Sequence, residues 1–214
     1  MPGILPCAGP LANSMEDLEL FMKTVLNAKP WQFDSSVLPI PWTPRPSESA
    51  EELGSRALNI GVLPEQPGVA LHPPVVRALE NALAALSTAG QKIIRLPFKS
   101  DTAVLTAWEP TFDMYMLDPL DTAKSHIFKS GEPPVPAVLR VSLPEESKHI
   151  YSIDEFAALN VKREKYAAAW HQVWLEHHLD ILICPGLSTT AVAHNTSAMP
   201  IYTTMWNYLD VSWP

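Results

Sequence analysis

The chain has 214 residues, of which 47% are hydrophobic and 18% are charged, and its formal net charge is −8. This length suits one domain with its own core, and the acidic excess disfavours a nucleic-acid partner, since phosphate binding depends on clustered lysine and arginine. No apolar run approaches the roughly 18 residues needed to cross a bilayer, so the sequence predicts no membrane span and no membrane partner.

The first twenty residues, MPGILPCAGPLANSMEDLEL, lack a positively charged n-region and carry three prolines among the first ten. This is not the pattern of a secretory signal, and we expect a cytoplasmic protein. The only cysteines are Cys7 and Cys184. Two cysteines fit a reducing compartment and offer neither a disulfide framework nor a zinc cluster.

The first predicted element is a helix that begins after Ser14, with Asp17 at the capping-box position. Pro30 ends it, and residues 30–56 are rich in proline, which predicts an irregular excursion within the domain. One face of the helix is apolar: Leu18, Phe21, Met22, Val25 and Leu26.

The next segment has the pattern of an α/β unit. ALNIGVL (57–63) is a short apolar run typical of a buried strand, and KIIRLPF (92–98) is predicted as the strand that follows. HPPVVRALENALAALSTAG (72–90) between them predicts a helix with proline in its first turn and Gly90 at its end. A strand, a helix and a strand joined by short loops predict a parallel pair covered by helices.

The remaining elements follow in the same style. Residues 101–118 predict a helix with a kink or break at Pro110, and residues 130–150 form a proline-rich connection, with a short edge strand as one option. Ser152 and Glu155 form a capping box before the longest helix, and ILICP (181–185) is a third buried strand. In this helix we expect seven packing residues: Phe156, Leu159, Val161, Tyr166, Trp170, Val173 and Trp174.

Five strings, in this order and at this spacing, carry a resemblance to a known family: GPLANSMEDLELFMKTVLNAKPW, VLPIPW, ALNIGVL with HPPVVRALENALAALSTAGQKI, DILICPG, and TSAMPIYTTMWNYLDVSWP. They resemble the central-to-C-terminal part of fungal acetamidase-type members of the amidase signature family, over nearly the whole chain. The resemblance implies an α/β fold, a partial α/β/α sandwich with a small mostly parallel or mixed sheet flanked by helices. It also implies that residues 1–214 are a single domain truncated at both ends.

The resemblance further implies serine hydrolysis of carboxamides by a Ser-Ser-Lys triad, whose serines lie in a Gly/Ser-rich signature upstream of the first helix. No GGSS, GSSGG or G-x-S-x-G string occurs in the 214 residues. The only adjacent serines, Ser35 and Ser36, have no neighbouring glycine and are typical of a turn. A serine needs a base and oxyanion donors to attack an amide, so we expect no hydrolysis by this chain alone.

Other catalytic candidates are weaker. Cys184 precedes Pro185 at the carboxyl end of a predicted parallel strand, where open α/β sheets bind ligands. His194 and His72 are its nominal bases, and a buried core thiol is the alternative. By resemblance, the C-terminal segment contributes to an acyl-binding channel, whereas packing against the sheet is the simpler explanation. Five residues are the candidates for this pocket: Met199, Tyr202, Met205, Trp206 and Tyr208.

The sequence predicts no metal site and no cofactor. His171 and His178 lie two helical turns apart, too far for one ion, and we expect them and His177 to be solvated or to pair with the helix end. Asp113, Asp118 and Asp121 do not match an EF-hand loop, and we expect a solvated acidic face.

Three functions remain open at this point. The first is an amidase-family protein that lacks the triad and does not hydrolyse amides alone. The second is a repurposed enzyme of fungal small-molecule metabolism, of the cyclase or isomerase type, that keeps the family's apolar pocket for a small apolar ligand. The third is an interaction module whose open sheet edges pair with a second copy or with a complementary chain.

Overall fold

The computed structural model divides the chain into two compact units, Pro6–Arg56 and a larger one of Met1–Leu5 with Ala57–Pro214. Each unit is described by itself, and their union in one domain stays a prediction. The structure describes residues 3–4, 9–35, 37–43, 56–118, 122–133, 135–136, 149–194, 196 and 200–209.

The smaller unit contains the predicted first helix, α1 (Met15–Asn27). The Ser14 hydroxyl accepts a hydrogen bond from the Asp17 backbone amide at 3.1 Å, which satisfies one of the free amides at the helix start. A short 3₁₀ turn, Pro30–Gln32, follows the helix, after Lys29 with a φ of 55°. The cap and the end before Pro30 confirm the prediction, although none of the 13 helical residues is buried.

The larger unit is built on a three-stranded sheet of β1 (Asn59–Val62), β2 (Lys92–Arg95) and β3 (Ile181–Ile183). The strand order is β2-β1-β3, and both pairs are parallel. The three strands lie where the sequence predicts them, but β3 is not the buried strand expected, because Ile181 is 42% exposed and Leu182 and Ile183 are only partly buried. Asp180 fixes the β1–β3 register, because its carboxylate accepts from the Asn59 amide at 2.8 Å and its own amide donates to the Asn59 carbonyl.

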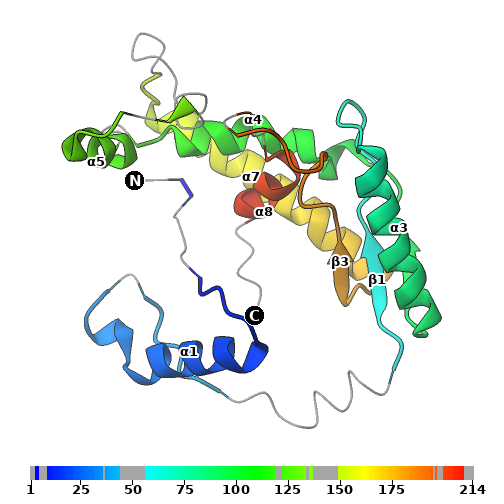
Figure 1. Cartoon of the computed structure of the whole chain (residues 1–214). Helices are drawn as coiled ribbons and strands as arrows, with labels where there is room; N and C mark the ends of the chain where they lie inside the picture. Colours follow the sequence, from blue (N-terminus) through cyan, green and yellow to red (C-terminus); the bar gives the residue numbers. More distant parts are fainter. Residues whose placement is uncertain are drawn as a thin grey trace. The chain divides into compact units, whose positions relative to one another are not determined.

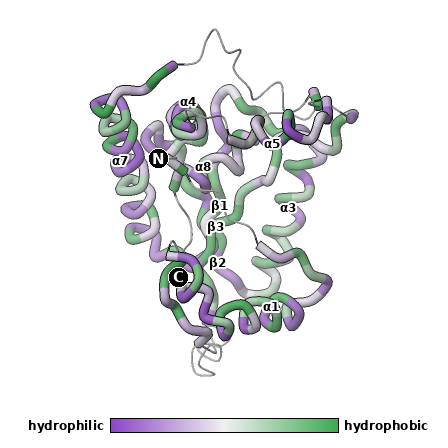
Figure 2. Tube along the Cα trace, turned by 90° about the vertical axis from the view of Figure 1, so that its left-hand side faces the viewer, coloured by the Kyte–Doolittle hydropathy of each residue, from purple (hydrophilic) through white to green (hydrophobic). Residues whose placement is uncertain are grey.

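Helix α3 (Pro73–Thr88) packs against β2, with Leu83 as its buried residue. Figure 2 shows the strands between α3 and α7 (Ile153–His177), so helices cover both faces of the sheet. Gly90 has a φ of +86° directly after the helix cap, a conformation that glycine adopts without strain. The helices on both faces confirm the expected α/β/α arrangement.

The main core lies where α7 meets α4 (Val104–Tyr115) and α8 (Ile201–Leu209), on the side of the sheet away from α3 (Figure 1). A side chain at Gly61 would place its Cβ 2.9 Å from Leu179, so the glycine lets that leucine lie directly on the sheet. The buried core contains Leu63, Leu96, Val104, Ala107, Met114, Leu159, Tyr166, Trp170, Val173, Leu179, Tyr202, Met205 and Tyr208.

Several details differ from the sequence prediction. Helix α4 continues through Pro110, whereas the sequence left a break open. A further helix, α5 (Thr122–Ser130), has no apolar stripe and was not predicted. Val161 is 49% exposed, so its expected packing role is wrong. Residues 137–148 of the proline-rich connection lie outside the described residues. No helix in the described part of the chain is long and apolar enough to span a bilayer.

Candidate functional site

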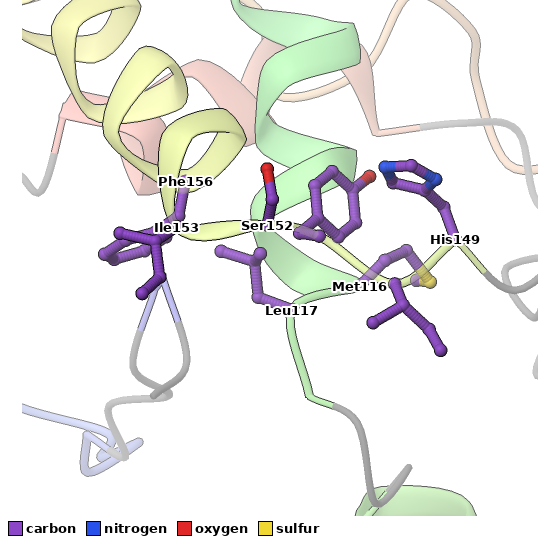
Figure 3. Close-up of a pocket in the computed structure, with 8 residues that line it drawn as sticks. Met116, Leu117, His149, Ser152, Ile153 and Phe156 are labelled. Carbon is purple, nitrogen blue, oxygen red and sulfur yellow. The ribbon is translucent and has the colours of Figure 1, made fainter.

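A cavity of about 270 Å³ opens where the end of α4 meets the start of α7. Figure 3 shows Met116 and Leu117 at the end of α4 facing the first residues of α7. Ile150 and Ile153 are 88% and 85% exposed at its rim, so the cavity is open to solvent. Its lining is apolar at Met116, Leu117, Ile150, Ile153 and Phe156 and polar at His149, Tyr151 and Ser152.

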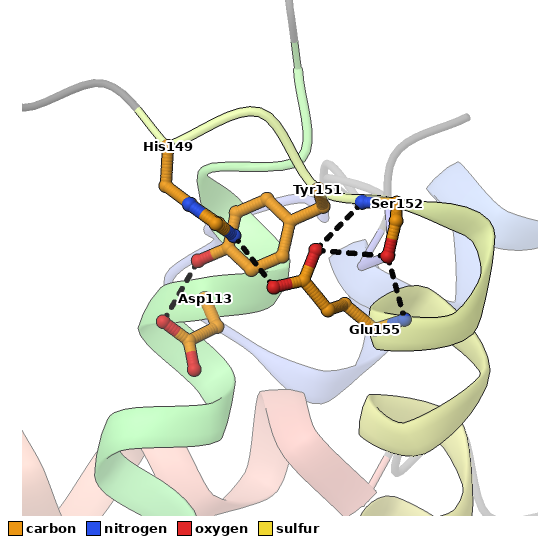
Figure 4. Close-up of polar contacts among 5 residues, drawn as sticks. All are labelled: Asp113, His149, Tyr151, Ser152 and Glu155. Atoms are coloured by element: carbon orange, nitrogen blue, oxygen red, sulfur yellow. Dashed lines mark hydrogen bonds and ion pairs between the residues drawn. The ribbon is translucent and has the colours of Figure 1, made fainter.

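The polar wall of this cavity adjoins the capping box of α7, to which Ser152 belongs (Figure 4). The Ser152 hydroxyl accepts from the Glu155 amide at 3.2 Å, and Glu155 Oε2 accepts from the Ser152 amide at 2.7 Å. The Ser152 hydroxyl also lies 2.9 Å from Glu155 Oε2, and His149 Nε2 lies 2.9 Å from Glu155 Oε1. These contacts, the Ser152 backbone amide first, hold the pKa of Glu155 below its usual value.

A second polar contact ties the start of α7 to α4. The Tyr151 hydroxyl donates to Asp113 Oδ1 at 2.9 Å. Asp113 therefore has a hydrogen-bond partner just before α7, and it is not part of a purely solvated acidic face. Burial, and then the Asp113 carboxylate, raise the pKa of Tyr151 to about 12. The His149 ring meets the Tyr151 ring edge-on, with centroids 4.5 Å apart.

Serine, histidine and glutamate therefore lie together here, but in the wrong order for acyl transfer. A nucleophilic serine needs a base that receives its proton, with a third group orienting that base. In this cluster the Ser152 hydroxyl contacts Glu155 directly, and His149 contacts the other oxygen of the same carboxylate. A carboxylate with a lowered pKa is a weak base at neutral pH. The arrangement stabilises the helix start and leaves the serine unactivated.

The predicted catalytic candidates lie elsewhere and do not meet. Cys184 directly follows β3, and burial raises the pKa of its thiol, partly offset by a hydrogen bond with Trp206. His194 is exposed, and no hydrogen bond joins Cys184 to a histidine within the described residues. The His72 amide donates to the Ser188 carbonyl at 2.8 Å, which places the His72 backbone beside the loop after β3.

The predicted pocket residues of the C-terminal segment lie mostly in the core. Tyr202, Met205 and Tyr208 are buried in α8, and the Tyr202 hydroxyl donates to the Val69 carbonyl at 3.0 Å. Trp206 is partly buried beside Trp170, with ring centroids 6.4 Å apart. Met199 lies outside the described residues. Their role in lining an acyl channel stays a prediction.

Sequence reasoning missed His149 and Tyr151 as parts of a site. A signal for Tyr151 was present, because it directly precedes the cap Ser152 while Phe156 lies at the fourth helical position. Apolar or aromatic residues at these two positions commonly pack together at a helix start. Nothing in the sequence pairs His149 with Glu155 or Tyr151 with Asp113.

The remaining predicted groups differ from one another. His171 and His178 are exposed, as expected, whereas His177 Nε2 is buried without a hydrogen-bond partner among the described residues, so the expected solvation of His177 is wrong. Asp118 Oδ2 accepts from the Thr122 amide at 2.6 Å at the start of α5, and Asp121 lies outside the described residues. Within the part of the chain that the structure describes, no three His, Cys, Asp or Glu side chains come together as a metal site.

Comparison with known proteins gives a consistent result. A family model described as Amidase matches residues 1–214. An amidase of Gibberella moniliformis is 30% identical over 97% of the chain, and an acetamidase of Emericella nidulans is 32% identical over 94%. An amidase of Gibberella zeae is 35% identical over 94%.

A solved structure of fatty acid amide hydrolase matches 94% of the chain with a TM-score of 0.78 and 28% sequence identity. The coverage of these relatives is partial. The chain spans 37% to 38% of the length of the three fungal proteins and 34% of the solved hydrolase chain.

Proposed function

This chain belongs to the amidase family, and from that premise we propose that its 214 residues supply sheet and helices of an amide-hydrolase fold without supplying the nucleophile. By itself the chain then does not cleave amides. The match covers 37% to 38% of the length of two fungal relatives, so most of each relative lies outside the matched region. We propose that their catalytic residues lie in that remainder.

The observation that carries this proposal is the surroundings of the serine hydroxyls. Among the described residues, no serine hydroxyl is hydrogen-bonded to a lysine or a histidine. The serine hydroxyls that do form hydrogen bonds contact backbone groups or Glu155. The sequence also contains no GGSS, GSSGG or G-x-S-x-G string, the glycine-framed patterns that place backbone donors beside a serine.

Ser188 is the best alternative candidate for a nucleophilic serine. It follows β3 at the carboxyl end of the parallel sheet, the usual place of a ligand crevice in such folds. Its carbonyl accepts from the His72 amide, but its hydroxyl makes no hydrogen bond with the His72 ring. Without a base in contact, Ser188 has no activated form at neutral pH.

Ammonia release from acetamide tests the proposal. We expect the purified 214-residue chain to release no more ammonia than its Ser188→Ala variant, while the Emericella nidulans acetamidase serves as the positive control. Turnover that is present in the chain and lost in one serine variant would overturn the proposal.

We also propose that the chain works in the cytoplasm of a fungal cell, in small-molecule metabolism. The free Cys184 and the fungal origin of the relatives support this. Cell fractionation with an antibody against the chain tests the location, and recovery in the secreted fraction would contradict it.

A second candidate function rests on the cavity at the start of α7. We propose that this apolar cup takes the apolar end of a small molecule, since Ile153 and Phe156 line it and no charged group faces it without a partner. A medium-chain fatty amide should then raise the melting temperature of the chain. The Phe156→Ala variant should lose this shift, and Leu175→Ala, near the other end of α7, should keep it. Equal shifts in both variants would contradict the assignment.

A further inference from the structure

We propose that a second cleft, between α4 and α7, binds a small zwitterion with an apolar side chain, of the α-amino acid class. This inference is independent of amide hydrolysis and of the apolar cup. It concerns a cavity of about 360 Å³, a volume within the usual range of small-molecule sites. The cavity is lined by Asp101, Thr106, Glu109, Pro110, Lys162, Lys165, Tyr166 and Tyr208.

The two long walls of this cleft come from neighbouring helices. Figure 1 shows α4 and α7 side by side, with α8 against both. Thr106, Glu109 and Pro110 are spaced by three and four residues on α4, and so are Lys162, Lys165 and Tyr166 on α7. This spacing places each set on one face of its helix.

The walls carry opposite charges that do not neutralise one another. The α4 side presents Asp101 and Glu109, and the α7 side presents Lys162 and Lys165. Among the described residues none of these four side chains forms an ion pair, whereas Arg95–Glu80 and Lys99–Glu176 do. A wall with two carboxylates that faces a wall with two ammonium groups complements a ligand that carries one charge of each sign.

The inner wall carries a polar group without a partner. Tyr208 is 1% exposed, and its hydroxyl has no hydrogen-bond partner among the described residues. Buried hydroxyls are almost always hydrogen-bonded, so an orphaned one next to a cavity indicates a missing partner. The hydroxyl of the adjacent Tyr166 differs, because it donates to the Ala103 carbonyl at 3.3 Å.

The α4 wall also carries a backbone acceptor. Pro110 has no amide hydrogen, so the Thr106 carbonyl loses the donor that an α-helix would give it. Carbonyl and carboxylate oxygens on this wall suit an ammonium group. The Lys162 and Lys165 ammonium groups on the other side suit a carboxylate, and the ring of Pro110 in the cavity wall suits an apolar side chain.

Calorimetric titration of the whole chain with three related compounds tests this assignment. L-phenylalanine carries both charges, phenethylamine lacks the carboxylate and 3-phenylpropanoate lacks the ammonium group. We expect L-phenylalanine to bind roughly tenfold more tightly than either analogue, the effect of losing one charge-assisted contact. Equal binding of 3-phenylpropanoate would make this an anion site and overturn the proposal, as would no binding of L-phenylalanine.

Variants locate the binding in the cleft. The double substitution Lys162→Ala with Lys165→Ala removes two exposed side chains and should weaken L-phenylalanine roughly tenfold while leaving phenethylamine unchanged. Lys92→Ala on β2 is the matched control and should change nothing. Tyr208→Phe keeps the buried ring, removes the hydroxyl and should also weaken L-phenylalanine. Unchanged affinity in the double variant would place the binding elsewhere and overturn the proposal, even if Tyr208→Phe fails to fold.

Discussion

Helix α8 and the first turn of α7 both present apolar and aromatic side chains, and the fold uses the two sets in opposite ways. Met205 and Tyr202 of α8 are buried against α4 and β-sheet loops, where no solvent reaches them. Ile150 and Ile153 at the start of α7 are almost fully exposed around an open cavity. Residue type alone thus does not separate pocket walls from core, because packing of neighbouring elements decides which apolar side chains remain accessible.

The two regions also differ in what holds them. The α8 region depends on apolar burial, and its side chains donate hydrogen bonds to backbone carbonyls, as Tyr202 does to Val69. The α7 start depends on a shared network in which Glu155 accepts from Ser152 and contacts His149. Substitutions in the first region should therefore act through cavities, and those in the second through polar contacts and pH.

The largest difference should appear when a methionine and an isoleucine are shortened to alanine. Met205→Ala removes a fully buried side chain and should lower the free energy of unfolding by about 2 to 5 kcal/mol. Ile153→Ala removes an exposed side chain and should change the free energy of unfolding by less than about 0.5 kcal/mol. Urea denaturation measures both, and similar losses in the two variants would break the comparison.

A smaller effect is expected from the cap of α7. Ser152→Ala removes the hydroxyl that accepts from the Glu155 amide and should cost about 1 kcal/mol of unfolding free energy. Ser87→Ala on the exposed face of α3 is the control and should be near neutral. If both serine variants have the same urea midpoint, the capping box does not hold the start of α7.

Acid should act on the same network. Folding lowers the pKa of Glu155, chiefly through the Ser152 amide, so the stabilisation is present above the carboxyl's unfolded pKa and is lost as pH falls through the folded value. Between about pH 6 and pH 3, the wild-type chain should lose more stability than Glu155→Gln. Parallel stability curves for the two proteins would show that Glu155 titrates alike when folded and unfolded.

Alkali should act on both regions alike. The pKa values of all five tyrosines are raised, those of Tyr151 and Tyr208 to about 12, with burial as the first cause. The folded chain at about pH 11 should therefore absorb less as tyrosinate than the same chain in denaturant. A phenol whose pKa is raised by folding stabilises the fold below its unfolded pKa, and this stabilisation is lost as pH rises. Equal absorbance in both states would contradict the burial of these rings.

The helices and strands could be predicted largely because their signals are local. Ser14 and Ser152 with residues three positions later set the starts of α1 and α7, and short apolar runs set β1, β2 and β3. Helix α5 could not be predicted, because TAKSHIFKS has no apolar periodicity. The residue that accepts a hydrogen bond at its start, Asp118, lies four positions before Thr122 rather than in the usual capping-box position. The packing role of Val161 also failed, because Val161 lies about 200° around α7 from Leu159 and so falls off the face that carries the buried residues.

The sites were less accessible to sequence reasoning. The capping pair of Ser152 and Glu155 is a local pattern and was predicted. The contact of Tyr151 with Asp113 joins residues 38 positions apart, and the cleft of Glu109 with Lys162 joins two helices, so both depend on how α4 packs on α7. Neither helix alone carries a signal for its partner.

The central claim is that this amidase-family chain holds no activated serine, and a serine-reactive fluorophosphonate probe tests it directly. Peptide mapping after labelling should find no serine modified to stoichiometry in the native 214-residue chain, whereas the Emericella nidulans acetamidase should label fully. Stoichiometric labelling of a single serine, Ser188 or Ser152 above all, that disappears on denaturation would contradict the account.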